Sequence, residues 1–144
     1  MNEAKQHFLA EQKLAIVGIS ATKGFGNTVY RDLQKKGYIL YPVSKTANEI
    51  DGTACYKKLE EIPDTIGGVI TVVPPAVTLD ITKECVKLGI KRIWMQPGSD
   101  SGEAMQVAFE NHIETIVNSC IMMYAKPDGM HKVHGWFTKL VGKY

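Results

Sequence analysis

The sequence of 144 residues lacks the features that mark membrane-spanning, exported and nucleic-acid-binding proteins. No apolar run approaches the ~20 residues that cross a bilayer, and the polar first segment has no signal-peptide core. The net charge of +2 gives no bulk attraction to nucleic acid or to an anionic membrane surface. The only three cysteines lie far apart, which is typical of free thiols in a reducing compartment. We therefore expect a cytoplasmic protein with neither a membrane nor a nucleic acid as partner.

The sequence also lacks internal repeats, low-complexity segments and linkers. Its 44% hydrophobic and 22% charged residues are those of a globular domain with a real core. We expect a single domain over 1–144, with its core over about 13–122 and a C-terminal helical extension over 128–144.

Short apolar runs alternate with amphipathic stretches along the chain. The predicted strands cover 14–18, 38–43, 53–56, 68–73, 91–95 and 114–117, and the predicted helices cover 3–11, 27–36, 76–88 and 103–111. This alternation predicts a parallel sheet covered on both faces. With 53–56 as a short third strand at the edge, right-handed crossovers give the order 3-2-1-4-5-6. We therefore predict a single Rossmann-like, doubly wound α/β domain, with a ligand crevice between 14–18 and 68–73.

The segment LAIVGISATKGFGNT, residues 14–28, is the first candidate for a binding site. A buried strand ends at Gly18, a loop with Gly24 and Gly26 follows, and an amphipathic helix begins. The first N–H groups of a helix have no partner inside the helix, and its dipole adds partial positive charge there. The pattern therefore predicts a phosphate-bearing ligand at this corner.

The residues of an NAD site are absent from this corner. The glycines do not follow the G-x-G-x-x-G spacing, and the second strand ends in PVSK with no acid to bind ribose hydroxyls. The G-x-x-x-x-G-K-[ST] pattern for ATP is also missing. Lys45 could pair with a phosphorylated ribose, so the residues alone leave both NADP and coenzyme A open as the ligand.

Five segments resemble a known family in the same order. They read VGIS…KGFGN, YPVSK, GVITVVPP, IWMQPG and VNSCIM, and the resemblance runs from about Lys13 to Met122. They resemble the stand-alone CoA-binding proteins, which are similar to the N-terminal CoA-binding domain of the succinyl-CoA synthetase α subunit. The resemblance implies a non-catalytic module that binds CoA or acyl-CoA. Such a module would sense the cofactor, carry it or form a disulfide with its thiol.

The resemblance also implies a set of ligand-binding residues. Those expected along the pyrophosphate and adenosine are Gly18, Ser20, Ala21, Thr22, Lys23, Gly26 and Asn27, with Ser44 and Lys45 at the nucleotide end. Those expected beside the adenine or pantetheine and along the path beyond are Val73, Pro74, Met95, Gln96, Pro97, Asn118 and Cys120. The chain departs from the synthetase in the length and glycine placement of its first loop. The synthetase's second domain, with its phosphorylated histidine, is absent.

Other side chains suggest chemistry without completing a site. Cys120 could form a mixed disulfide with CoA or be an inert buried thiol. His131 and His134 offer two ligands where zinc needs three or four, so we expect no metal site. No Ser-His-Asp, Cys-His or paired-carboxylate set can be assembled at the strand ends, and we expect no catalytic residue.

Two alternative functions and two partners stay open at this point. One alternative is an NADP-dependent oxidoreductase, and the other is a CoA-binding subunit of a larger acyl-CoA ligase whose catalytic parts lie on another chain. Trp136 and Phe137 are expected to dock the last helix on the sheet or on a second subunit of a homodimer.

Overall fold

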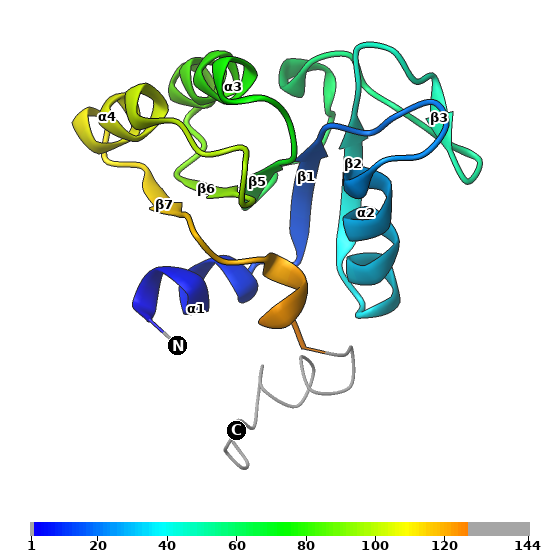
Figure 1. Ribbon diagram of the computed structural model, residues 1–144, viewed down its shortest axis with the longest axis horizontal. Helices are drawn as coiled ribbons and strands as arrows, with labels where there is room; N and C mark the ends of the chain where they lie inside the picture. The colour runs from blue at the N-terminus through cyan, green and yellow to red at the C-terminus, as the bar shows by residue number, and fades with distance from the viewer. Residues whose placement is uncertain (1, 127–144) are drawn as a thin grey trace.

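The computed structural model describes residues 2–126 and contains a five-stranded parallel sheet between two layers of helices (Figure 1). The strands are β1 (Lys13–Val17), β2 (Ile39–Val43), β5 (Gly68–Thr71), β6 (Arg92–Met95) and β7 (Glu114–Ile116), in the order β2-β1-β5-β6-β7. The helices are α1 (Glu3–Leu9), α2 (Phe25–Lys35), α3 (Pro75–Leu88) and α4 (Gly102–Glu110), with two 3-10 turns, η1 (Leu59–Glu61) and η2 (Ile121–Met123). The order reverses between β1 and β5, where the sequence predicts the crevice. The predicted helix over 128–144 lies outside the described residues.

The two faces of the sheet carry separate apolar cores. Because successive side chains of a strand point to opposite faces, Leu14 and Ile16 of β1 pack under α1 and α2. Ala15 and Val17 pack with α3 and α4 on the other face. All four are buried, as a central parallel strand requires. The doubly wound fold predicted from the sequence is confirmed, and within residues 2–126 no helix is long and apolar enough to cross a membrane.

The prediction that residues 53–56 form an edge strand of the main sheet is wrong for most of the segment. The segment instead folds back as an antiparallel hairpin of β3 (Glu49–Ile50) and β4 (Thr53–Ala54), and only Tyr56 reaches the main sheet, in one parallel bridge to Val43. The turn between β3 and β4 is Asp51-Gly52, with φ of 48° and 85°. Two positive φ values in a two-residue turn are the geometry of a tight hairpin. The Asp-Gly pair was the sequence signal for this turn.

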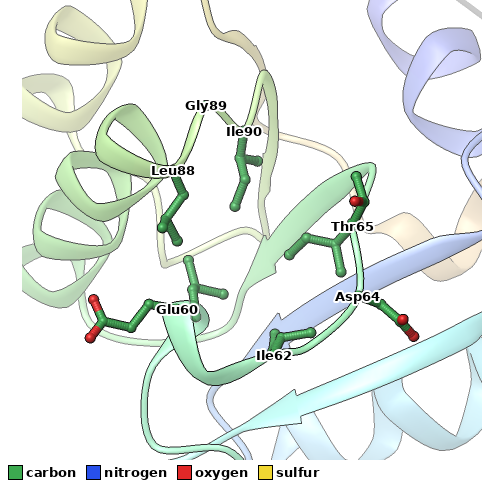
Figure 2. Close-up of a pocket in the computed structure, with 9 residues that line it drawn as sticks. Glu60, Ile62, Asp64, Thr65, Leu88, Gly89 and Ile90 are labelled. Carbon is green, nitrogen blue, oxygen red and sulfur yellow. The ribbon is translucent and has the colours of Figure 1, made fainter.

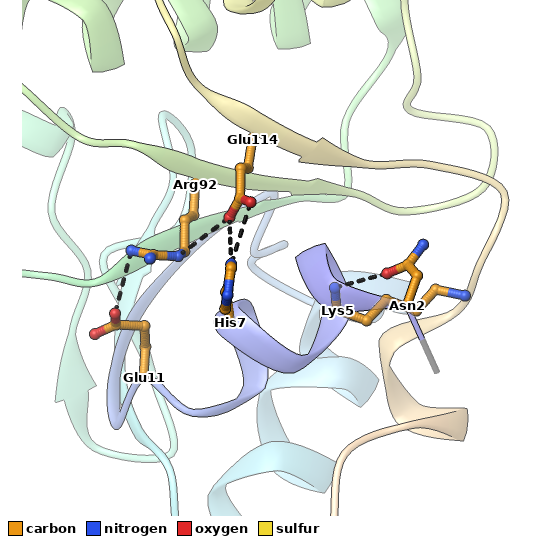
Figure 3. Close-up of polar contacts among 6 residues, drawn as sticks. All are labelled: Asn2, Lys5, His7, Glu11, Arg92 and Glu114. Carbon is orange, nitrogen blue, oxygen red and sulfur yellow. Dashed lines mark hydrogen bonds and ion pairs between the residues drawn. The ribbon is translucent and has the colours of Figure 1, made fainter.

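Helix α1 is fixed to the sheet by an ion cluster at the amino ends of β6 and β7 (Figure 3). His7 Nδ1 lies 3.2 Å from both carboxylate oxygens of Glu114. Arg92 Nη1 donates to Glu11 at 3.3 Å, and its Nε lies 3.5 Å from Glu114. Phe8 of the same helix is buried, and its ring meets Trp94 edge-on at 5.4 Å. The helix thus closes the sheet at the edge opposite the predicted crevice.

Candidate functional site

The sequence-predicted site residues all lie at or just beyond the carboxyl edge of the sheet. Parallel strands end at the same edge, and ligands of open α/β sheets bind outside it, where the strand order reverses. The residues come from five segments: Gly18, Ser20, Ala21, Thr22, Lys23, Gly26 and Asn27 after β1; Ser44 and Lys45 after β2; Val73 and Pro74 after β5; Met95, Gln96 and Pro97 at the end of β6; and Asn118 and Cys120 after β7. The fold therefore brings together five segments that are far apart in the sequence.

Two glycines allow β1, β5 and α2 to meet closely at this edge. Gly18 has a φ of +122°, and a Cβ there would lie 2.2 Å from the carbonyl oxygen of Val72. A Cβ on Gly26 would lie 2.3 Å from the carbonyl oxygen of Gly18. Only glycine fits either position. As a result, the first turn of α2 sits directly on the end of β1.

The N-terminus of α2 is open to an anion. Its N-cap, Gly24, has no side chain to accept from the first turn, and that turn contains no acid. Asn27 N and Thr28 N bond to the Gly24 carbonyl, but the N–H groups of Phe25 and Gly26 meet no acceptor among residues 2–126. In contrast, α1 and α4 are capped by the side chains of Asn2 and Ser101 and carry a glutamate in the first turn. Free donors with the positive end of the helix dipole suit a phosphate.

Two of the predicted ligand residues use their polar groups within the protein. The Asn27 side chain accepts from Ser20 N at 2.8 Å and donates to Ser20 O at 3.0 Å. Ser44 Oγ donates to Ile19 O at 2.6 Å and accepts from Ala47 N at 2.9 Å. Asn27 is 3% and Ser44 4% exposed. These two residues shape the first loop, and they present little surface to a ligand.

The exposed residues of the loops are the ones that can touch a ligand. The residues open to solvent are Ala21, Thr22, Lys23, Lys45, Pro74, Pro97 and Asn118, and those partly open are Gly18, Ser20, Val73 and Cys120. Phe25, at the first position of α2, is 50% exposed and was not predicted as a site residue. Its signal in the sequence was an aromatic residue between two glycines at the expected start of the helix.

A buried hydroxyl cluster fixes the turn after β5 to the loop after β6. Ser99 Oγ lies 2.7 Å from Thr78 Oγ1, donates to Thr71 Oγ1 at 2.9 Å and accepts from Val73 N at 3.4 Å. All three hydroxyl-bearing residues are buried. The cluster holds Val73 and the proline after it in place at the crevice, and nothing in the linear motif indicated it.

Met95 and Gln96 are fully buried, so in this structure they support the site from beneath. Gln96 Oε1 accepts from Ile121 N at 2.7 Å, and Gln96 Nε2 donates to Cys120 Sγ at 3.4 Å. The Gln96 side chain therefore fixes the segment after β7 to the end of β6. That Met95 and Gln96 line the ligand path stays a prediction, and both side chains are buried in this structure.

The three cysteines are free thiols in different surroundings. Burial raises the pKa of Cys85 to about 12 and raises the pKa of Cys55. Cys120 is half-buried at the carboxyl edge. Among residues 2–126, no group of three or more His, Cys, Asp or Glu side chains is arranged to hold a metal ion.

A cavity of about 240 Å³ lies at the other edge of the sheet, between the end of α3 and the segment before β5 (Figure 2). Leu88, Ile90 and Ile62 supply much of its apolar lining, and Glu60 and Asp64 are the charged residues beside it. Acids without a lysine or arginine in the lining do not suit a phosphate. This cavity is therefore not a second candidate for phosphate binding beside the N-terminus of α2.

Comparison with known proteins identifies the family. The chain matches the family described as CoA binding domain over residues 12–126. The chain belongs to this CoA-binding family. It is 33% identical over 81 residues to the ADP-forming acetate–CoA ligase of Methanocaldococcus jannaschii, a match that covers 56% of this chain but only 12% of the ligase.

Two solved structures are similar over most of the chain. A conserved hypothetical protein from Pyrococcus furiosus has a TM-score of 0.74 and 36% identity, covering 78% of this chain and 97% of that one. A hypothetical protein from Pyrococcus horikoshii has a TM-score of 0.79 and 32% identity, covering 84% and 87%. The resemblance to stand-alone CoA-binding proteins is thus confirmed, together with the Rossmann-like fold.

Proposed function

We propose that this chain is a non-catalytic cytoplasmic CoA-binding module that senses or carries CoA or an acyl-CoA. The observation that carries the proposal is the uncapped N-terminus of α2, held against Gly18 by Gly26, in a chain of the CoA-binding family. The free N–H groups of Phe25 and Gly26 suit the pyrophosphate of CoA. The scarce, widely spaced cysteines support the cytoplasmic location.

The surrounding residues support one direction for the ligand. Lys45 follows β2 and carries the charge for the phosphate on the CoA ribose, since no acid stands there to hold free ribose hydroxyls. The pantetheine arm would then run from α2 past Val73 and Pro74 toward Asn118 and Cys120, which follow the last strand. Apolar turn residues beside the arm and cations beside the phosphates match the chemistry of the cofactor.

Calorimetric titration of the full chain with CoA, dephospho-CoA and NADP tests this function. We expect CoA to bind most tightly, dephospho-CoA more weakly and NADP least, because NADP has a nicotinamide ribose where CoA has a flexible arm. Absence of heat with CoA at micromolar protein would overturn the proposal. Preferential binding of NADP would revive the oxidoreductase alternative.

A second function is suggested by the small share of the ligase that the match covers. The match covers 12% of the Methanocaldococcus ligase, so most of that ligase lies outside the part that is similar to this chain. We propose as the alternative that the chain supplies the CoA site to a separate acyl-CoA ligase chain. Co-purification of a ligase-like chain with the tagged protein would support a subunit, whereas recovery of the protein alone or as a homodimer would support the free module.

The position of Cys120 supports a thiol exchange with the bound cofactor. In the proposed step, the Cys120 thiolate attacks CoA disulfide, forms a Cys120–CoA disulfide and releases one CoA thiolate, so no further oxidant is needed. Mass spectrometry of the protein after incubation with CoA disulfide should show one CoA adduct. An adduct of equal yield on a Cys120→Ser variant would show that another cysteine reacts.

A further inference from the structure

The loop between β1 and α2 is held in shape by a side chain of the helix that follows it. Asn27, the third residue of α2, reaches back to Ser20 and bonds both its N–H and its carbonyl oxygen, at 2.8 and 3.0 Å. A third-position side chain ordinarily bonds the N–H of the N-cap residue. Here the carboxamide instead bonds Ser20, which lies before the N-cap, Gly24, and closes the loop between two residues seven positions apart.

The remaining contacts make Ser20 the fixed point of this loop. Ser20 Oγ accepts from Thr22 N at 3.3 Å, and a Cβ on Gly24 would lie 3.1 Å from the Ser20 Cβ. Ser44 fixes the preceding residue through the carbonyl of Ile19. The loop is therefore tied at 19–20 and at its helical end, while residues 21–23 between them are exposed.

From this geometry we propose that Asn27 is a positioning residue of the phosphate corner and does not itself contact the ligand. By fixing Ser20, it aims the exposed turn 21–23 and the free N–H groups of Phe25 and Gly26 at the same phosphate. The inference rests on the proposed binding of CoA at α2, and it changes the role that the family resemblance implies for Asn27.

The amide suits this role better than a carboxylate for two reasons. An aspartate could accept from Ser20 N but could not donate to Ser20 O. It would also place a negative charge in the first turn of α2, beside the ligand phosphates. Such a charge interacts favourably with an empty helix N-terminus but repels a phosphate, and salt weakens that repulsion.

Two substitutions and a matched control test the role of Asn27. Asn27→Ala removes both bonds, and Asn27→Asp keeps one and adds a charge. The control is Asn111→Ala, because Asn111 also bonds a backbone carbonyl, that of Val107, but stands at the C-terminal end of α4. The measurements are CoA affinity by calorimetry at low and high salt, and amide hydrogen exchange at Ser20 in the free protein.

We expect Asn27→Ala to weaken CoA binding roughly tenfold, the effect of about one lost hydrogen bond to a buried group, and to speed exchange at Ser20. Asn27→Asp should keep slow exchange at Ser20 yet lose more affinity at low salt than at high salt. Asn111→Ala should change neither quantity.

The outcomes separate this inference from the proposed function. If the unmodified protein does not bind CoA, the proposed function fails, whatever happens at Ser20. If it binds and Asn27→Ala binds equally well despite fast exchange at Ser20, the positioning role is overturned. Should Asn27→Ala not fold, Asn27→Asp decides alone: affinity equal to that of the unmodified protein at low salt overturns the inference.

Discussion

Lys45 is the residue at which the ligand's identity can be tested most directly. It is exposed at the end of β2, with no acid beside it in the sequence. We expect Lys45→Ala to weaken CoA binding about three- to tenfold, as for loss of a charge-assisted contact, and to weaken dephospho-CoA less. Calorimetry with both ligands measures the difference, and Lys87→Ala, in the last turn of α3, is the control. Equal losses for the two ligands would show that Lys45 does not bind the extra phosphate.

Gly26 links the stability of the fold to the shape of the site. A methyl group there would press against the Gly18 carbonyl at 2.3 Å, so β1 and α2 would have to separate. We expect Gly26→Ala to lower the free energy of unfolding by about 1–3 kcal/mol and to abolish tight CoA binding. Urea denaturation checks the first effect and calorimetry the second.

Gly102 provides the matched control for Gly26. It is the first residue of α4, and a Cβ there would meet nothing within 4 Å. We expect Gly102→Ala to be neutral or slightly stabilising, because alanine favours the helix. Equal destabilisation by the two substitutions would contradict the steric argument.

At the residue scale, the sequence predicted which loops meet at the carboxyl edge of the sheet better than which of their side chains are exposed there. The glycine pattern located Gly18 and Gly26 because glycines between a strand end and a helix start are a recognisable local signal, although the close approach that Gly18 permits, to Val72, is made only in the fold. Whether Asn27 and Gln96 face outward or inward depends on Ser20 and Ile121, contacts made through the folded chain. A linear motif carries no information on such contacts.

At the scale of elements, periodicity predicted the sheet and its helices because burial on two faces leaves continuous apolar runs. The runs 14–18 and 68–73 became the central strands β1 and β5. The error over 53–56 arose because a four-residue run has little periodicity, and the Asp51-Gly52 turn decided its direction. The start of α2 also lies two residues before the prediction, which places Gly26 and Asn27 inside the first turn.

A separate group of ion pairs attaches helix α1 to the sheet. Arg92 contacts both Glu11 and Glu114, and all three side chains are only partly exposed. We expect Arg92→Ala to lower the free energy of unfolding by about 1 kcal/mol, more at low salt than at high salt, without changing CoA affinity. Lys13→Ala is the control, because its single contact to Asp64 spans 4.0 Å on an exposed surface. A large loss of CoA affinity in Arg92→Ala would show that the two edges of the sheet are coupled.

For the whole molecule, the two edges of the sheet differ in their chemistry. Open donors, exposed lysines and the half-buried Cys120 lie at the carboxyl edge. The ion cluster of α1 and the hollow beside Leu88 lie at the amino edge. In this arrangement, a ligand at the carboxyl edge would leave the amino edge free to contact another chain, as the proposed ligase subunit requires.

The reactivity of the thiols in the intact protein tests whether the ligand covers the carboxyl edge of the sheet. With a pKa near 12, Cys85 is ionised in only about one molecule in ten thousand at pH 8, and burial also disfavours the thiolate of Cys55. We therefore expect a disulfide reagent at pH 8 to modify Cys120 first, and saturating CoA to slow that modification by about tenfold or more as it covers the crevice. Peptide mass spectrometry identifies the modified residue, and Cys120→Ser should lose the fast phase while retaining the fold. Fast modification of Cys120 that CoA leaves unchanged would mean that the pantetheine arm does not extend to the end of β7, and the proposed path of the ligand would have to be redrawn.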